Sequence, residues 1–148
     1  MRASNRYLLT SAAMLAAAAI NSVTFATSSQ GAASTVWDGV YTDAQAKRGE
    51  EASKTMCVTC HGDELAGSDL APALQGSDFN GVWSGRTAGE LYEKINTTMP
   101  ADRVGSLKPP QSADLVAYIF KLNAFPAGSA ELASEMPALA QIKIQSKK

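Results

Sequence analysis

The chain has 148 residues, of which 45% are hydrophobic and 18% are charged, and its formal net charge at pH 7 is −1. This balance is that of an ordinary globular domain and excludes a disordered or fibrous chain. The absence of a basic excess also argues against a protein that binds nucleic acid.

The N-terminal segment is typical of an export signal. Arg2 and Arg6 lie near the start of the chain, and the uncharged apolar run from Tyr7 to Ile20 follows them. Signal peptides have the same order of a charged region and a hydrophobic region. We therefore predict a signal peptide over residues 1–33, cleaved within 26–33, and a periplasmic mature protein without a membrane span. An uncleaved membrane anchor is the alternative, although the apolar run is shorter than the roughly 20 residues that a span needs.

The first predicted helix runs from Asp43 to about Thr55, with Thr42 or Asp43 as its N-cap. One face of this helix is unusually small, because Gly49 shares it with alanine and serine residues. Such a face indicates close approach by another backbone and not a large apolar stripe. From Gly62 to Gly85, the abundance of glycine, aspartate and serine predicts loops.

The second predicted helix begins at Thr87 and ends near residue 97. Thr87 and Glu90 form the pattern of a capping box, and apolar residues follow at helical spacing. Met99 precedes a proline, which disfavours the helical conformation at this residue. We therefore expect Met99 in an extended or turn conformation just beyond the helix.

The third predicted helix follows a pair of prolines, takes Ser112 as its cap and closes at Asn123. The alternation of Ile142 and Ile144 is too short to predict a strand, and no other segment shows convincing strand periodicity. We therefore predict an all-α domain over residues 34–128, followed by a C-terminal extension over residues 129–148.

Cys57, Cys60 and His61 are the chain's entire stock of thiols and imidazole, and they lie within five consecutive positions. Structural zinc requires four ligands, which cysteine and histidine cannot supply here. A thioredoxin-like redox pair requires a strand–helix–strand context, whereas this motif follows a predicted helix. The pattern Cys-x-x-Cys-His instead predicts covalent haem, with Cys57 and Cys60 bonded to the porphyrin and His61 bonded to the iron.

Three stretches resemble monohaem class I cytochromes c of the bacterial periplasm: CVTCHG, TMPADRVGSL and AYIFKLNAFPAG. The resemblance covers roughly residues 37–128. The stretches WDGVYT, TTMP and NAFPAG are similar to cytochromes that accept electrons from quinoprotein (PQQ-type) dehydrogenases. The resemblance implies a small class I fold of three main helices around one haem c. It also implies a one-electron carrier that cycles between Fe(III) and Fe(II), and not an enzyme.

Met99 is the predicted second axial ligand of the iron. A second histidine is excluded because the chain has only one, and Met/His ligation is the next pattern to consider. Two of the five methionines leave with the predicted signal peptide, Met56 directly precedes the motif, and Met136 lies in the extension. The resembled family keeps its distal methionine in a loop placed like that of Met99. Five-coordinate iron and ligation by Met136 are the alternatives.

The resemblance also implies residues that support the haem. In the family, the carbonyl of a proline about a dozen residues after the ligating histidine accepts its second N–H, and Pro72 matches that position. Apart from the resemblance, Trp83 and Arg86 are candidates for hydrogen bonds to a haem propionate, because of their charge or polarity and their place before the second predicted helix; a core tryptophan and a solvated arginine are the alternative.

The resemblance further implies a close crossing of the first and last helices, at Gly49 and Tyr118. Ser53 departs from the family pattern, which often has an aromatic residue there, and this leaves the tightness of the crossing open.

The implied partners are redox proteins. A PQQ-type dehydrogenase is the expected electron donor, and an oxidase or another cytochrome is the expected acceptor. Two alternatives stand beside this carrier. One is a haem subunit docked in a dehydrogenase complex through Trp37 or through the basic tail of Lys143, Lys147 and Lys148. The other is an open-iron sensor or peroxidase-like protein, which follows if Met99 is not a ligand.

Overall fold

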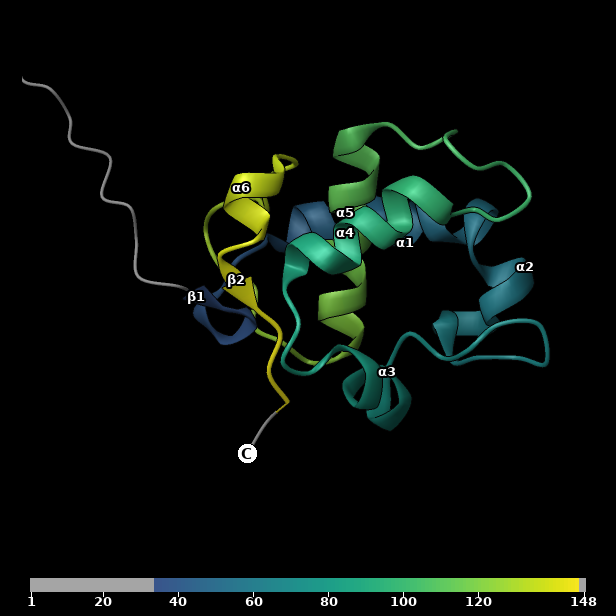
Figure 1. Cartoon of the computed structure of the whole chain (residues 1–148), viewed down its shortest axis with the longest axis horizontal. Helices are drawn as coiled ribbons and strands as arrows, with labels where there is room; N and C mark the ends of the chain where they lie inside the picture. The colour runs from purple at the N-terminus through teal and green to yellow at the C-terminus, as the bar shows by residue number, and fades with distance from the viewer. Residues whose placement is uncertain (1–33, 147–148) are drawn as a thin grey trace, which may run out of the picture. The chain divides into compact units, whose positions relative to one another are not determined.

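Helices dominate residues 34–146, the part of the chain that the computed structural model describes (Figure 1). The predicted all-α class is confirmed, because the strands in this part are only two residues long. The predicted signal peptide lies outside the described residues. In chain order the elements are β1 (Ser34–Thr35), η1 (Val36–Asp38), α1 (Asp43–Met56), α2 (Val58–His61), η2 (Asp63–Leu65), α3 (Gly76–Trp83), α4 (Ala88–Thr98), α5 (Pro109–Leu122), α6 (Met136–Leu139) and β2 (Ile142–Lys143).

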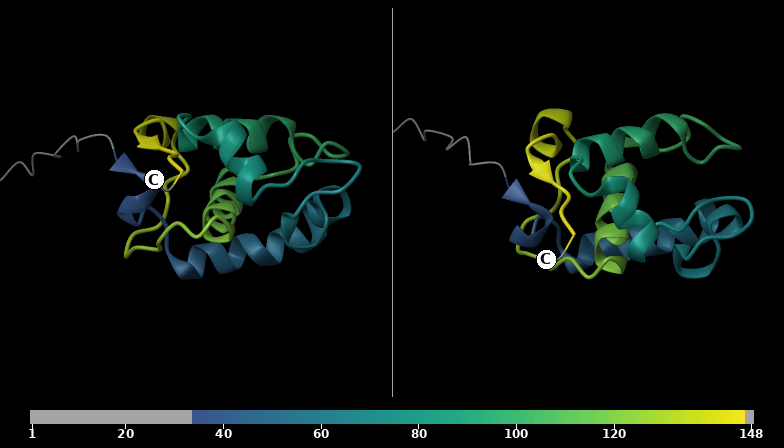
Figure 2. Two further views of the ribbon diagram at one scale, coloured as in Figure 1. Left: turned by 90° about the horizontal axis from the view of Figure 1, so that it is seen from below. Right: turned by 60° about the horizontal axis from the view of Figure 1, so that its bottom comes forward.

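Helix α1 begins where the sequence predicts and crosses α5 at close range (Figure 2). The side chain of Thr42 caps its first turn. A Cβ atom built at Gly49 would overlap the backbone carbonyl of Asp114 and lie 2.8 Å from the Cβ atom of Tyr118. Only glycine permits this approach. The crossing is therefore tight even though Ser53 replaces the aromatic residue of the family pattern.

Helices α4 and α5 also form near their predicted positions, but the predicted cap of α5 is wrong. The capping box of α4 is present: Thr87 Oγ1 accepts the N–H of Glu90 at 3.1 Å, and Glu90 accepts the N–H of Thr87 at 2.8 Å. In α5 the N-cap is Lys108. Ser112 is fully buried inside the helix and donates to Asn96 Oδ1 at 3.0 Å. Proline is favoured at the first helical position, so the helix begins at the proline pair.

The expectation of loops throughout residues 62–85 is wrong for α3. The segment GSDFNGVW is poor in helix-favouring residues. Its helix is stabilised by packing, because Phe79 is buried and stacks on Trp83 with 6.4 Å between the ring centroids. Tertiary contacts here override local propensity, and the sequence pattern carries no sign of them.

The predicted C-terminal extension packs back on the helices. β2 pairs in parallel with β1, with Ser34 opposite Ile142. Ile144 accepts the N–H of Gly85 at 2.8 Å and donates its own N–H to the carbonyl of Arg86 at 2.9 Å. Both isoleucines are buried. Ile142 therefore begins a strand too short to predict from its alternation with Ile144, and the partner of this strand lies 108 residues earlier in the chain.

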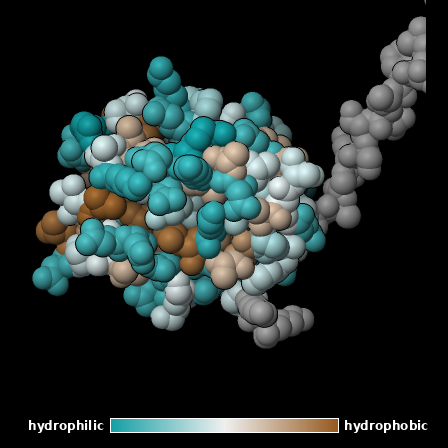
Figure 3. Space-filling model, turned by 180° about the vertical axis from the view of Figure 1, so that it is seen from behind, coloured by the Kyte–Doolittle hydropathy of each residue, from teal (hydrophilic) through white to brown (hydrophobic). Residues whose placement is uncertain are grey.

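Most large apolar side chains of the described residues are buried, and a few stay at the surface. Figure 3 shows apolar residues gathered mainly on one side of the face, towards the end that carries α2 in Figure 1. The exposed large apolar side chains are Leu70, Val82, Val104 and Met136.

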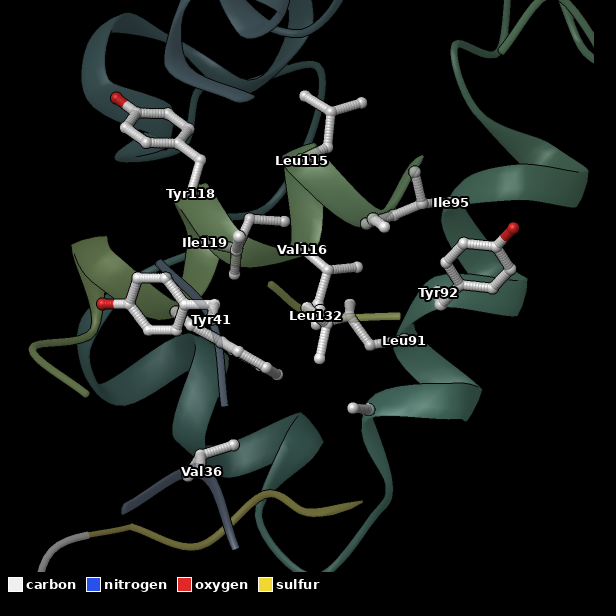
Figure 4. Close-up of a cluster of buried hydrophobic side chains, with 14 of the residues drawn as sticks. Val36, Tyr41, Leu91, Tyr92, Ile95, Leu115, Val116, Tyr118, Ile119 and Leu132 are labelled. Carbon is white, nitrogen blue, oxygen red and sulfur yellow. The ribbon is translucent and has the colours of Figure 1, made fainter. Parts of the chain in front are cut away.

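The core forms around α5. Figure 4 shows side chains of α4 and α5 turned towards one another, with Val36 and Tyr41 closing one end of the cluster. The buried residues of α5 are nearly consecutive: Ser112, Ala113, Leu115, Val116, Ala117, Tyr118, Ile119 and Phe120. A helix buried on almost all sides is the central element of a small domain.

None of the helices within residues 34–146 combines the length and the apolar character needed to cross a membrane.

Candidate haem-binding site

The Cys-x-x-Cys-His motif lies where α1 ends and the single turn of α2 begins. Cys57 is the C-cap of α1, and Cys60 and His61 lie in α2. The N–H groups of Cys60 and His61 both bond to the carbonyl of Cys57, at 3.1 and 2.9 Å. The two thiols are not joined to each other, and the Cys60 side chain is exposed. One tight turn therefore presents two thiols and an imidazole, with both sulfur atoms available for bonds to a ligand.

His61 is held in a defined orientation. Its side chain is 8% exposed, and its Nδ1 lies 2.7 Å from the carbonyl oxygen of Pro72. A carbonyl can only accept, so Nδ1 carries the proton and Nε2 keeps its lone pair. This is the arrangement of a metal-ligating histidine, in which the second ring nitrogen donates to a carbonyl. The contact expected between these two residues is present.

The loop after the motif, residues 62–75 (the proximal loop), folds back on it. The N–H of Gly67 donates to the carbonyl of His61 at 2.7 Å, and Ser68 Oγ donates to the carbonyl of Cys60 at 2.5 Å. Leu74 donates to the carbonyl of Leu65 at 2.8 Å. These bonds close the proximal loop and fix the path of the chain on both sides of Pro72.

The Cys57 thiol is not activated as a nucleophile. Burial, followed by the nearby Cys60 thiol, raises the pKa of Cys57 to about 11. Cysteines of dithiol redox motifs have a lowered pKa, because the thiolate is the reactive form. A raised pKa keeps Cys57 protonated at neutral pH and disfavours the thioredoxin-like alternative.

Met99 is the C-cap of α4 and has the extended backbone predicted for it, with φ −120° and ψ 153°. Figure 2 shows the end of α4 and the short helix α2 at the same end of the described unit, one on each side. Met136 belongs to α6, which Figure 1 places at the other end. Met56 lies in the last turn of α1, directly before the motif. The arrangement therefore favours Met99 over Met136 and Met56 as the residue that faces the motif.

The segment after Met99, residues 100–108 (the distal segment), is exposed apart from Pro100 and Leu107. Residues 101–106 are all exposed, and Leu107 is buried. One side-chain hydrogen bond reaches α1, from Arg103 Nη2 to the carbonyl of Thr55 at 3.4 Å. This is a long contact at the surface, so it stabilises the distal segment only weakly.

Trp83 and Arg86 lie together, but not on the motif. The Arg86 guanidinium lies over the Trp83 ring, 5.5 Å from its centroid, a cation–π contact. Both line an open hollow of about 320 Å³ along α4, with Glu90, Glu93, Lys94 and Thr97. Within residues 34–146 neither side chain hydrogen-bonds to Cys57, Cys60 or His61. Their expected role at a propionate stays a prediction.

Some of the residues expected to dock the chain to a dehydrogenase already make contacts within the domain. Trp37 Nε1 donates to the carbonyl of Gln145 at 2.9 Å, and its ring packs edge-on against Phe125 with 5.0 Å between centroids. Lys143 lies in β2. Lys147 and Lys148 lie outside the described residues. Trp37 thus holds the C-terminal extension in place.

The residues around the motif fit a covalent haem. The thiol pair is unbridged and the Nε2 lone pair of His61 is free to bind iron. Partly buried apolar side chains from the motif, the proximal loop and the end of α4 pack against the core, including Val58, Leu74 and Met99. They offer a flat porphyrin an apolar lining.

Sequence reasoning missed one residue that bears on this site. The side chain of Asn123, at the end of α5, hydrogen-bonds to Leu74 of the proximal loop and to Gly76 just beyond it. Its sequence signal is only that of a helix terminus, because its partners lie almost fifty residues earlier.

Comparison with protein-family models gives a match over residues 44–119, just over half of the chain, to the family described as cytochrome c oxidase, cbb3-type, subunit III. The matched region runs from the first turn of α1 into α5 and includes the motif, Pro72 and Met99. Searches of curated proteins and of solved structures gave no match.

Proposed function

Because the chain belongs to the family described as cytochrome c oxidase, cbb3-type, subunit III, and is thus a monohaem class I cytochrome c, we propose that it is a periplasmic one-electron carrier. Haem c is its cofactor, and its partners are redox proteins. In this proposal a dehydrogenase supplies the electrons, and a terminal oxidase lies further along the same route.

We assign the haem to four residues. Cys57 and Cys60 would hold the porphyrin through thioethers, and His61 and Met99 would bind its iron. The observation that carries this assignment is the 2.7 Å contact between His61 Nδ1 and the Pro72 carbonyl, which leaves Nε2 for the metal. When bound, the haem supplies a centre that exchanges one electron between Fe(III) and Fe(II).

The residues of the chain favour electron exchange as its activity, and not chemistry on a substrate. His61 is buried and fixed by Pro72, so its imidazole does not have to reorient between the two oxidation states. With the thioether sulfur of Met99 as a second ligand beside His61, the bound iron would have no position left for a substrate. Methionine also raises the reduction potential relative to a second histidine.

Spectroscopy of the purified holoprotein tests this proposal. We expect haem that stays with the polypeptide on a denaturing gel, a one-electron redox titration, and no binding of carbon monoxide by the native reduced protein. Rapid binding of carbon monoxide would instead favour the open-iron sensor or peroxidase-like protein.

Export and the donor are separate parts of the proposal. The N-terminal pattern of Arg2, Arg6 and the apolar run supports export, and mass spectrometry of the periplasmic protein should find an N-terminus within residues 26–33. The similarity of WDGVYT, TTMP and NAFPAG to cytochromes of quinoprotein dehydrogenases supports a PQQ-type donor. Stopped-flow mixing with a purified PQQ dehydrogenase should reduce the haem. No reduction by such an enzyme would exclude this class of donor and leave the carrier role intact.

A further inference from the structure

The proximal loop is joined to the central helix through one side chain. Asn123 is the C-cap of α5. Its Oδ1 accepts the N–H of Gly76 at 3.0 Å, and its Nδ2 donates to the carbonyl of Leu74 at 3.0 Å. Apart from His61, no other residue outside the loop hydrogen-bonds to it through a side chain, among the residues that the structure describes.

The contact with Leu74 bears directly on Pro72. The two residues are separated by one position, which spans at most about 7 Å of chain. The peptide groups of Leu74 are held from two directions, since its N–H donates to the carbonyl of Leu65 at 2.8 Å and its carbonyl accepts from Asn123. A shift of Leu74 therefore changes the direction of the Pro72 carbonyl that His61 requires.

We propose that Asn123 is a positioning residue for His61. By holding Leu74 and Gly76 against α5, its amide keeps the Pro72 carbonyl in line with Nδ1 of the imidazole. A hydrogen bond at Nδ1 orients the ring and makes it a stronger electron donor at Nε2. The inference rests on the proposed function, because it takes His61 to be an axial ligand.

A purely local role for Asn123 predicts something different. Nδ2 also donates to the carbonyl of Ile119 at 2.8 Å, which satisfies the end of its own helix. If that were its whole role, replacing Asn123 would loosen the last turn of α5 and leave His61 unchanged. The two roles are therefore separated by a measurement on the imidazole, and not by stability.

The experiment compares the holoprotein with its Asn123→Ala variant. NMR of the reduced state should show the His61 Nδ1 proton exchanging with solvent roughly tenfold faster, as the loss of about one net hydrogen bond predicts. The reduction potential should rise, because a less basic imidazole stabilises the oxidised state less. Asn123→Asp is the second variant. It keeps an oxygen for Gly76 but loses the donor to Leu74, so it should speed the exchange of the Nδ1 proton in the same direction.

Asn80→Ala is the matched control. Asn80 Nδ2 donates to the carbonyl of Gly76 at 2.8 Å, so this amide lies on α3 beside the same residue without bonding to the proximal loop. It should leave the exchange rate and the potential at their original values. Unchanged values in both Asn123 variants, in a protein whose spectrum keeps histidine ligation, would overturn the inference alone. A parent protein whose spectrum lacks histidine ligation would overturn the proposed function together with the inference.

Discussion

The two sides of the candidate haem site are built differently. On the proximal side, the motif and the proximal loop bond to each other through Gly67 and Ser68, and Asn123 ties the loop to α5. On the distal side, residues 101–106 are exposed, and the hydrogen bonds of the distal segment are mostly its own turns, such as Arg103 to Pro100 at 2.9 Å. The proposed proximal ligand, His61, is thus buried and held by the folded chain, whereas the proposed distal ligand, Met99, precedes an exposed segment.

This difference predicts that, of the two proposed ligands, Met99 is the more easily displaced. Segments with few buried contacts and exposed hydrogen bonds open at a lower free energy than the core. We therefore expect a perturbation of the proximal side to cost global stability. A perturbation of the distal side should change the coordination of the iron while the domain stays folded.

Gly49→Val is expected to break the crossing of α1 and α5, which supports the proximal side, with the largest loss of stability. A Cβ atom at this position would overlap the Asp114 carbonyl, which belongs to a backbone and cannot move aside as a side chain would. We expect a loss of about 3 kcal/mol or more in chemical unfolding.

Gly81→Ala is the matched control for Gly49→Val. Gly81 also lies inside a helix, and a Cβ atom there would meet nothing within 4 Å. It should be neutral or stabilising by up to about 1 kcal/mol. Equal losses for the two variants would contradict a close crossing of α1 and α5.

Tyr41, which precedes α1, should make a smaller contribution to the free energy of unfolding, and this contribution should depend on pH. Its hydroxyl donates to the carbonyl of Phe125 at 2.7 Å. Burial, followed by the charge of Asp43, raises the pKa of Tyr41 from its ordinary 10.0 to about 12. The folded state favours the neutral phenol, so this contribution is complete below the ordinary pKa and is lost as the pH rises through the folded one.

Urea unfolding at two pH values measures this contribution. Between about pH 9 and pH 11.5, Tyr41 should account for a loss of about 2 kcal/mol. The Tyr41→Phe variant should be less stable at the lower pH, because the Phe125 carbonyl loses its donor, and it should lose less on going to the higher pH. Parallel pH profiles for the two proteins would rule out Tyr41 as the cause.

Arg103→Ala should have the smallest effect on stability and sharpen the contrast between the two sides. The contact with Thr55 is long and exposed, so its loss should cost less than about 0.5 kcal/mol. We expect the reduced variant to bind carbon monoxide slowly, where the parent protein binds none, because the distal segment opens more often. A large loss of stability with no change in carbon monoxide binding would show that the segment is part of the core.

Much of the fold follows from local sequence rules. The N-caps at Thr42 and Thr87 and the apolar spacing of α4 and α5 are signals within a few residues of one another, so α1, α4 and α5 were predictable. Helix α3 and the pairing of β1 with β2 were not. Both depend on partners far away in the chain: the core that buries Phe79, and a strand 108 residues distant.

The candidate site divides in the same way. The motif of Cys57, Cys60 and His61 is contiguous and could be interpreted directly from its spacing. Pro72 and Met99 needed the resemblance to a family, because nothing local distinguishes a loop proline or a loop methionine. Asn123 had only the signal of a helix terminus, since only the folded chain brings its amide to the proximal loop.

The proposed electron carrier requires Met99 as the distal ligand of the iron. The spectra of one pair of variants test this assignment directly. In purified holoprotein, Met99→Ala should convert low-spin haem to high-spin haem, lower the reduction potential and allow carbon monoxide to bind, while the domain stays folded. Met136→Ala, at the other end of the unit, should leave all three unchanged. An unchanged low-spin spectrum in Met99→Ala, or its loss in Met136→Ala, would contradict the assignment.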